Sequence, residues 1–343
     1  MSTLPPGAHL DQLRRLAKDR LKAARAGDRA ALDWIGEVDS KLTLATAQLR
    51  LAREHGFASW PALQLEVQRR RLLDLRDARA LSAFVAEHPE LSKADLVHWR
   101  DHPVGASPLG YLAMARYDTA NREWRDVRDT AAAAQVLIAA GAPVDGPPGA
   151  RETPLITAAS YGDAEIASVL IAAGADVDAC ASADAGGVPG GSALLHAAVF
   201  GMTDVLDLLV AAGAKVRSIE EAAAAGDLSA WPLGRASEQA RVRALVMAAD
   251  HERVDVIEAL ARAGTPIDEE DETYRRHPLR LAAAHGRAES VRCLLRLGAD
   301  RTRRDRHGMT PLDHCRHGRA PAADASGHAE VERLLAGTPP VGD

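Results

Sequence analysis

The chain has 343 residues, with 42 Lys and Arg against 48 Asp and Glu, and only 3% aromatic residues. Its three cysteines are too few and too scattered for a disulfide framework, its first residues lack the apolar segment of a secretory signal, and no uncharged apolar run is long enough to cross a membrane. These features predict a cytoplasmic protein that is not embedded in a membrane. Arginine outnumbers lysine 37 to 5, which indicates a GC-rich, bacterial gene.

Residues 1–76 are predicted to form helices that cap the segments after them. Leucines recur at helical spacing over residues 9–26. In the later segment AREHGFASWPAL, the glycine ends one helix and Ser59 caps the next. Phe57 and Trp60 are predicted to pack into the joint between these two helices.

Thr153 to Asp178 read TPLITAASYGDAEIASVLIAAGADVD, and this pattern recurs along the chain. Thr153 can cap a helix whose first position is Pro154, and Gly162 ends that helix by entering the left-handed region. An apolar stripe at helical spacing then predicts a second helix, which Gly174 closes. A lone pair of helices cannot bury both faces, so neighbouring copies must supply the core.

Seven copies can be counted, of which the fourth is degenerate. The copies open at Ser107, Thr153, Ser192, Arg217, Arg243, His277 and Thr310. The segment 81–91 (LSAFVAEHPEL) is interpreted as the outer helix of a worn first repeat. The T-P-L opening and the step from Gly141 to Gly174 resemble the ankyrin repeat, whose period is about 33 residues. The segment AREHGFASWPAL resembles a leader that precedes the arrays of many bacterial ankyrin proteins.

The resemblance implies an all-α ankyrin-repeat solenoid, made of helix-turn-helix units with hairpin loops. Residues 1–76 would be an N-terminal helical cap, residues 77–338 an array of about seven units plus the worn first repeat, and residues 339–343 a disordered tail. Ankyrin arrays mostly bind other molecules on a concave face of hairpin tips and first helices. The implied function is therefore the binding of a protein or peptide, by a monomer.

The charge is unevenly distributed along the chain. Residues 1–100 carry 17 Lys and Arg against 13 Asp and Glu, residues 126–273 carry 9 against 24, and residues 274–343 carry 13 against 8. The acidic middle predicts a partner with a basic segment and argues against nucleic acid there. The alternative is a drift of charge on solvated surfaces. The carboxylates expected to steer such a partner are Glu220, Glu221, Glu269, Glu270, Asp271 and Glu272.

Three insertions break the period, at residues 114–130, 179–191 and 268–276. Long loops on a solenoid often gather on the binding face, although tolerated drift explains them equally well. Trp124 and Tyr274 lie in two of these insertions. They are the predicted exposed anchors, because Trp and Tyr are enriched in interface hot spots.

The remaining binding candidates lie at two kinds of position. Some are positions where the opening motifs differ from one repeat to the next, and others lie near the ends of the first helices. His251 and His285 align with Tyr161 and Phe200, so four rings would fall on a similar surface of successive repeats. Packing is the usual role of such rings, and a groove for a ligand is the alternative. The predicted binding residues are Tyr111, Trp124, His196, Glu220, Glu221, His251, Tyr274, Arg280 and His285.

No P-loop, G-x-S-x-G or H-E-x-x-H motif is present in the sequence. A rival interpretation is an enzyme that acts on a small or peptidic substrate in a pocket of the concave face. Its residues would be Tyr111, His196, Glu221 and Arg280, whose types suit acid–base chemistry. His314, Cys315 and His317 lie close together, but their spacing matches no metal signature, so no metal and no cofactor are predicted. A third interpretation is a structural array without one dominant partner.

Overall fold

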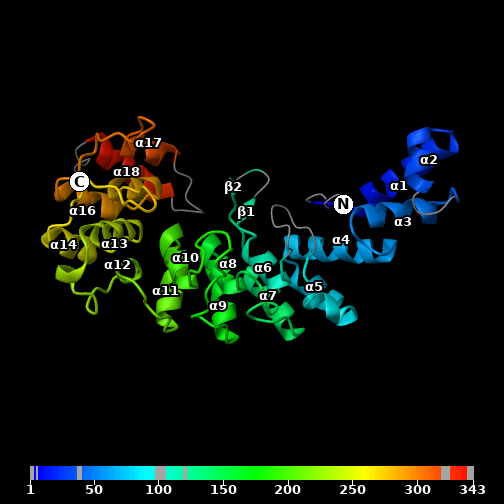
Figure 1. The fold of residues 1–343 in the computed structure, drawn as a ribbon, viewed down its shortest axis with the longest axis horizontal. Helices are drawn as coiled ribbons and strands as arrows, with labels where there is room; N and C mark the ends of the chain where they lie inside the picture. The colour runs from blue at the N-terminus through cyan, green and yellow to red at the C-terminus, as the bar shows by residue number, and fades with distance from the viewer. Residues whose placement is uncertain are drawn as a thin grey trace. The chain divides into compact units, whose positions relative to one another are not determined.

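The computed structural model describes residues 4, 7–36, 41–96, 106–118, 121, 123–317 and 325–337. These residues are mostly helices and connecting loops (Figure 1). The chain divides into two compact units. Unit 1 comprises Met1–Leu112, Thr119–Asn121 and Asp129–Pro143, and unit 2 comprises Ala113–Asp118, Arg122–Arg128 and Val144–Asp343. The predicted tail, residues 339–343, lies outside the described residues.

Unit 1 contains the helices of the predicted cap and the first helices of the array. They are α1 (Leu10–Arg25), α2 (Arg29–Gly36), α3 (Leu44–Glu54), α4 (Trp60–Leu75), α5 (Ala78–Glu87), the 3-10 helix η1 (Pro89–Ser92), α6 (Pro108–Ala113, with its last residue in unit 2) and α7 (Thr130–Ala139). Ser59 caps α4 through a hydrogen bond from the backbone N–H of Ala62, as its sequence predicts. Phe57 and Trp60 are partly buried against the apolar core of α1 to α4, which confirms their packing role.

Helix α4 is tied to the first repeat through a buried arginine. The guanidinium of Arg69 pairs with Glu66 on the same helix and donates to the carbonyl oxygens of Leu91 at 2.9 Å and Ala94 at 2.6 Å. Hydrogen bonds from a charged donor are stronger than neutral ones, so this side chain holds the end of the segment 89–95 against α4.

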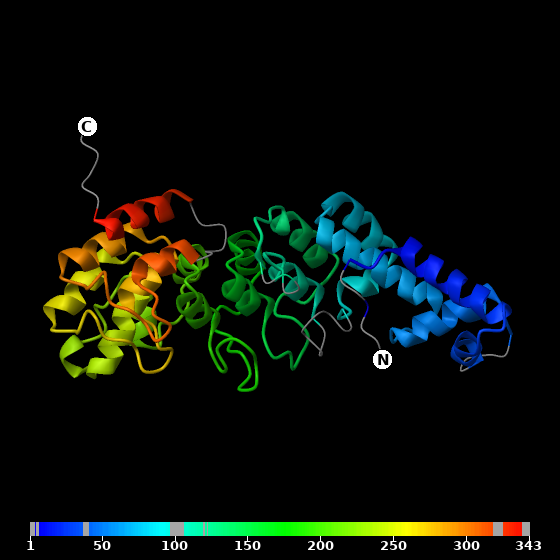
Figure 2. The same cartoon turned by 90° about the horizontal axis from the view of Figure 1, so that it is seen from above.

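Unit 2 contains two short strands and the helices of the remaining repeats. They are β1 (Tyr117–Asp118), β2 (Glu123–Trp124), α8 (Pro154–Tyr161), α9 (Ala164–Ala172), α10 (Ala193–Phe200), α11 (Thr203–Ala211), α12 (Ile219–Ala225), the 3-10 helix η2 (Leu233–Arg235), α13 (Glu238–Asp250), α14 (Val254–Arg262), α15 (Pro278–Ala284), α16 (Ala288–Arg296), α17 (Pro311–His317) and α18 (Ala325–Ala336). Each pair α8/α9, α10/α11, α13/α14 and α15/α16 is one predicted repeat (Figures 1 and 2). First helices of neighbouring repeats pack on one another, as α8 does on α10 and α15 on α17.

The small residues of the first helices explain how the repeats approach one another. Ala158 and Ala159 of α8, like Ala282 and Ala283 of α15, are fully buried. A methyl side chain lets two helices come close at little cost in helix propensity. Leucines of the same helices and apolar residues of the second helices fill the space that remains, as the shared core of α12 to α18 shows.

The degenerate fourth unit keeps its first helix and lacks a second α-helix. Helix α12 begins after Ser218 with a complete capping box and ends at Gly226. The chain then runs through η2 into α13, and Leu228, Trp231 and Leu233 of this connection pack against the core. These apolar side chains take the place of a second helix.

Aspartates of the hairpin arms link three pairs of successive repeats. The Asp145 carboxylate accepts the backbone N–H of Asp176 at 3.0 Å, and Asp178 accepts that of Lys215 at 2.9 Å. Asp268 accepts the N–H of Asp300 at 3.1 Å. The aspartate that recurs after Gly-Ala-x-Val or Gly-Thr-Pro-Ile therefore has a structural use, and it cannot be counted as free negative charge on the surface.

Two of the predicted insertions form compact local structures. Strands β1 and β2 pair in antiparallel fashion with Tyr117 opposite Trp124, a small departure from an all-α fold. The ring of Tyr161 is 6.0 Å from Tyr117 and 6.2 Å from Trp124, so three rings cluster. The loop 179–191 closes through a bridge between Cys180 and Ser192.

Candidate functional site

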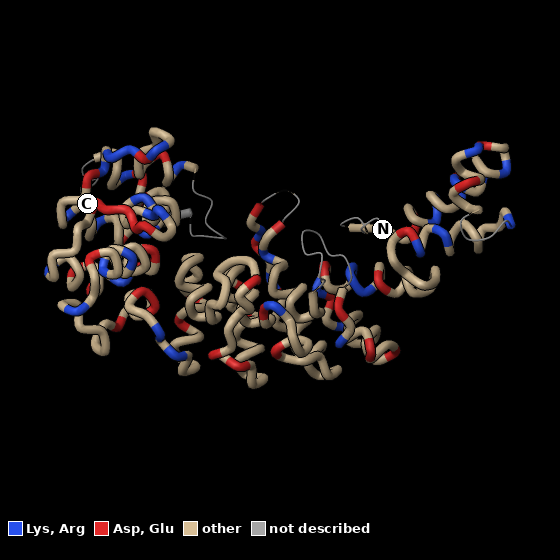
Figure 3. The backbone as a smooth tube through the Cα atoms, viewed as in Figure 1, with Lys and Arg blue, Asp and Glu red and all other residues tan. Residues whose placement is uncertain are grey.

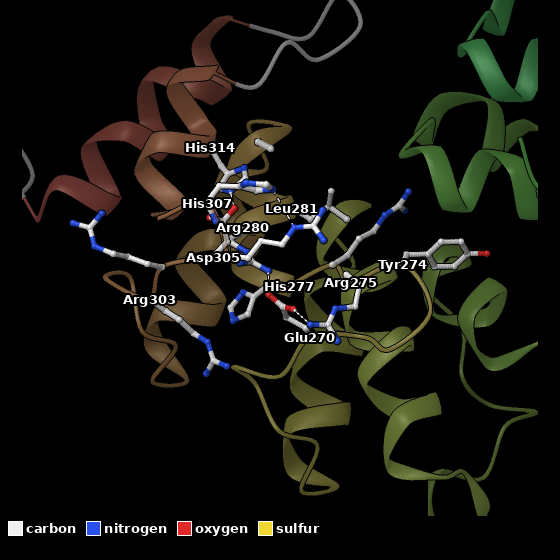
Figure 4. Close-up of a pocket in the computed structure, with 14 residues that line it drawn as sticks. Glu270, Tyr274, Arg275, His277, Arg280, Leu281, Arg303, Asp305, His307 and His314 are labelled. Carbon is white, nitrogen blue, oxygen red and sulfur yellow. Dashed lines mark hydrogen bonds and ion pairs between the residues drawn. The ribbon is translucent and has the colours of Figure 1, made fainter. Parts of the chain in front are cut away.

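A pocket of about 430 Å³ lies between two successive hairpin arms and the first helices that follow them. The arms are residues 268–276 and 300–309, and the helices are α15 and α17. The lining residues are Glu270, Tyr274, Arg275, Arg276, His277, Arg280, Leu281, Ala284, Arg303, Arg304, Asp305, Arg306, His307 and His314. Figure 4 shows these side chains, which come from the four segments.

The first arm is shaped by Asp271, which is 1% exposed. Its two carboxylate oxygens accept the backbone N–H groups of Tyr274 at 2.6 Å and Arg276 at 2.8 Å. Its own N–H donates to the carbonyl of Arg276 at 2.9 Å. Within this closed loop Arg275 has a φ of 55°, in the left-handed region that residues other than glycine seldom adopt. The aspartate therefore holds two arginines and a tyrosine at the pocket.

The second arm is shaped in the same way by Asp305. One oxygen of Asp305 accepts the N–H groups of His307 at 2.8 Å and Met309 at 3.0 Å, and the other lies 2.8 Å from Nε2 of His314 on α17. Burial opposes ionisation of this carboxyl group, but these hydrogen bonds outweigh it and lower the pKa of Asp305 to about 2. The arm is thus fastened to the helix behind it, with its arginines on the outside.

Helix α15 contributes a buried cation and a buried imidazole. Arg280 is 8% exposed and donates from Nη2 to Oε1 of Glu270, whose other oxygen is 3.5 Å from Arg275. His277 precedes the first turn of α15 and is 2% exposed. Burial, together with the charge of Arg280, lowers the pKa of His277 to about 4, so this imidazole is neutral at physiological pH.

The pocket has a clear excess of positive charge. Six arginines line it against two carboxylates, which leaves four positive charges when the histidines are neutral. The Arg303 side chain makes no hydrogen bond or ion pair within the part of the chain that the structure describes. Figure 3 shows acidic and basic segments alternating along the C-terminal repeats of unit 2. A site of this kind attracts anions.

Two predicted binding residues, Tyr274 and Arg280, line this pocket. Tyr274 is 40% exposed, and the guanidinium of Arg276 lies 5.1 Å from its ring centroid; its anchor role stays a prediction. Figure 4 shows the tyrosine at the edge of the pocket with its ring directed away from His277.

The two glutamates at the opening of α12 are engaged by neighbouring groups. Glu221 is 2% exposed and completes the capping box of that helix, and burial raises its pKa. Glu220 pairs with Arg243 at 2.6 Å. Of the carboxylates expected to steer a basic partner, Asp271 is held by its own arm, and Glu270 by Arg280 of α15. Glu269 and Glu272 are exposed.

The three predicted histidines form links between repeats. His196 is buried, with Nδ1 2.8 Å from Ser160 Oγ and Nε2 3.0 Å from the carbonyl of Val188. His251 is also buried, with Nε2 3.0 Å from the carbonyl of Ala198. His285 is a partner of the fully buried Asp250. These contacts differ from the stack of four rings that the sequence suggested, since Tyr161 pairs with Tyr117 and Trp124, and Phe200 with His196.

Tyr111 and Trp124 have structural partners as well. Tyr111 is 6% exposed, and its hydroxyl donates to Asp74 of α4 at 2.5 Å, so it joins α6 to α4 within unit 1. Trp124 is half-buried in the ring cluster of unit 2. Within unit 2, no hydrogen bond or ion pair among the described residues joins any two of His196, Glu221 and Arg280, three of the four residues of the predicted enzyme pocket.

Sequence reasoning missed Arg303, Arg304 and Arg306. The signal was present, since residues 301–307 read RTRRDRH and the segment 274–343 carries an excess of basic side chains. His314 is bonded to Asp305, and His317 Nδ1 is 2.7 Å from the carbonyl of Asp313. In the described ranges, no three His, Cys, Asp or Glu side chains are grouped to hold a metal ion.

The fold and the site define a helical repeat protein with a charged pocket on its hairpin arms. A family model described as ankyrin repeats in three copies matches residues 127–219, and one described as the ankyrin repeat matches residues 274–306. The protein therefore contains ankyrin repeats, and its fold is an all-α ankyrin-repeat solenoid. The second match includes the last three residues of the first arm (274–276), helix α15 and the arginines of the second arm.

The crystal structure of the human ASB11 ankyrin repeat domain is similar to this chain, with 20% sequence identity and a TM-score of 0.36. The match covers 79% of this chain and 96% of that one. No curated protein matches the chain. Among the described residues, no helix is both long and apolar enough to span a membrane. Ankyrin repeats generally act as protein–protein interaction modules.

Proposed function

We propose that this protein binds an acidic segment of a partner protein in the basic pocket between the arms 268–276 and 300–309. The observation that carries the proposal is the set of six arginines against two carboxylates around a cavity of about 430 Å³. Opposite charge across an interface steers encounter and sets specificity. Tyr274, exposed at the edge, would contact residues of the partner beside the acidic group.

The construction of the arms supports a binding role. Asp271 and Asp305 each satisfy two backbone N–H groups of their own arm and so hold the backbone that carries the arginines in place before a partner arrives. Arg275 is kept in a left-handed conformation, and backbone strain of this kind is often found at ligand-binding sites. A preorganised site loses less entropy on binding than a flexible one.

A partner with a basic segment is the second candidate. It is favoured by the 24 Asp and Glu of residues 126–273, against 9 Lys and Arg, and by the exposed side chains of Glu269 and Glu272. Several other carboxylates of that stretch are engaged within the protein, such as Asp145, Asp178 and Asp271. The acidic partner is therefore the stronger candidate at this pocket.

The sign of the partner's charge can be tested with labelled hexaglutamate, hexalysine and hexaserine peptides on the full-length protein. Fluorescence anisotropy should show binding of hexaglutamate, weakened by salt and lost in the variant Arg303→Glu. Arg262→Glu on helix α14, an exposed arginine outside the pocket, is the matched control and should bind normally. Tighter binding of hexalysine would favour the second candidate. Tighter binding of a short oligonucleotide than of hexaglutamate would overturn the acidic-protein proposal.

The N-terminal leader, the bacterial source, the monomeric state and the cytoplasmic location stay predictions. We also propose that helices α1 to α4 cap the array, because α4 holds the first repeat through Arg69 and Asp74. Size-exclusion chromatography with light scattering would test the monomer.

A further inference from the structure

Glu270 occupies part of the pocket as an internal carboxylate. It accepts a hydrogen bond from Arg280, and its second oxygen faces Arg275 at 3.5 Å. The Arg280 side chain is 9% exposed, and within the described residues Glu270 is its one hydrogen-bond partner. Burying a guanidinium without an anion is costly. Glu270 therefore compensates the charge of Arg280 when no partner is bound.

His277 lines the same pocket, and its two ring nitrogens have no hydrogen-bond partner among the described residues. Both nitrogens are buried, and none of the described residues bonds to either of them. Asp268 Oδ1 is 3.5 Å from Nε2, longer than a typical hydrogen bond. Buried polar atoms nearly always have a partner. Figure 4 shows the imidazole beside the contact between Glu270 and Arg280, so a group bound there could accept a hydrogen bond from His277.

We infer that the acidic group of the partner is a phosphorylated side chain, whose phosphate replaces Glu270 on Arg280. The inference rests on the proposed function, because it specifies which acidic group enters the pocket. Displacement of Glu270 would free the part of the first arm that carries this residue. Arg275, Arg280 and His277 would then face the phosphate oxygens.

A phosphate suits this pocket better than a carboxylate does. A phosphoserine carries about −1.5 to −2 charges at neutral pH and three acceptor oxygens, whereas a carboxylate carries one charge and two oxygens. A carboxylate from the partner would only repeat the contact that Glu270 already makes. The phosphate can engage two guanidinium groups and His277 together, and Arg303 adds a cation without a partner of its own among the described residues. Guanidinium–phosphate hydrogen bonds are charge-assisted and geometrically specific.

The experiment uses the full-length protein and three labelled Gly/Ser peptides that differ at one central residue: phosphoserine, glutamate or serine. Anisotropy titrations should show the phosphoserine peptide binding at least about tenfold tighter than the glutamate peptide, and the serine peptide weakest. The variant Glu270→Gln should strengthen phosphopeptide binding several-fold, because Arg280 no longer has to release a carboxylate. Glu269→Gln removes the same charge from the neighbouring, exposed residue and is the matched control. Its effect should be small.

The outcomes separate the inference from the proposed function. Equal binding of phosphoserine and glutamate peptides, both above serine, would overturn the inference and leave the acidic partner in place. If neither peptide binds better than serine, both fail. Should Glu270→Gln weaken phosphopeptide binding, or Glu269→Gln strengthen it as much, then Glu270 does not occupy the phosphate position. Arg303→Gln, at an exposed side chain, tests the pocket without risk to folding and should weaken phosphopeptide binding.

Discussion

Two buried histidines should make the stability of unit 2 fall as the pH is lowered from 7.5 to 5. Burial is the main cause that lowers the pKa of His251 and of His277 to about 4; Arg287 adds to it for His251, and Arg280 for His277. An unfolded histidine has a pKa of about 6.5. Between these two values the unfolded chain binds a proton that the folded chain does not. Stability is therefore fully present above about pH 6.5 and declines until about pH 4.

The size of the effect follows from the pKa difference. A pH of about 5 lies roughly 1.5 units below the pKa of the unfolded imidazole. Each buried histidine therefore lowers the free energy of unfolding by about 2 kcal/mol, and the two together lower it by about 4 kcal/mol. Urea unfolding followed by far-UV circular dichroism at about pH 7.5 and about pH 5 measures this loss directly.

The variant His251→Gln isolates one histidine. Its amide can replace one of the hydrogen bonds to Ala198 and Thr203, and it does not titrate. The variant should be less stable than the wild type near neutral pH, yet lose about 2 kcal/mol less between the two pH values. His307→Gln, at an exposed histidine, is the control and should leave the pH-dependent loss unchanged. An equal loss in His251→Gln and the wild type would refute the reasoning.

Three further predictions concern local structure. Gly201 has a φ of 72°, and an added Cβ would lie 2.8 Å from an oxygen of the fully buried Asp250, which His285 holds in place. Gly201→Ala should therefore lower the free energy of unfolding, measured in urea, by about 3 kcal/mol. Gly213 has a φ of 83° and no atom within 4 Å of an added Cβ, so Gly213→Ala should cost only the backbone strain of about 1–2 kcal/mol. Similar losses of unfolding free energy at the two glycines would contradict this prediction, because they would show that the contact of the added Cβ with Asp250 costs little. Asp271→Ala should open the first arm, so that amide hydrogen exchange at Tyr274 and Arg276 becomes much faster, while Glu272→Ala on the same arm should not change it. Ser218→Ala removes the cap of α12 and should lower the unfolding free energy by about 1 kcal/mol; a change below about 0.3 kcal/mol would mean that the capping box contributes little.

The helices and their ends were predictable because the signals that set them are local. Thr153 and Ser192 each accept a hydrogen bond from the backbone N–H three residues on, and Gly162 and Gly201 end the same two helices in the left-handed region. Such contacts depend on a few consecutive residues, so the sequence carries them in full. The regular recurrence of the unit then requires neighbouring copies to share a core.

The use of each charged side chain was decided by the tertiary structure. Residues 268–272 read as an acidic patch, yet Asp271 is turned inward by two backbone N–H groups and Glu270 is paired with Arg280. Stacking of the repeats then brings the arm of Arg303 beside that of Arg275, from the preceding repeat, and changes the sign of the local charge. The sequence by itself determined the repeat, its helices and its caps. The pocket required the stacked arrangement, because the side chains that line it come from two repeats and meet only when both are folded.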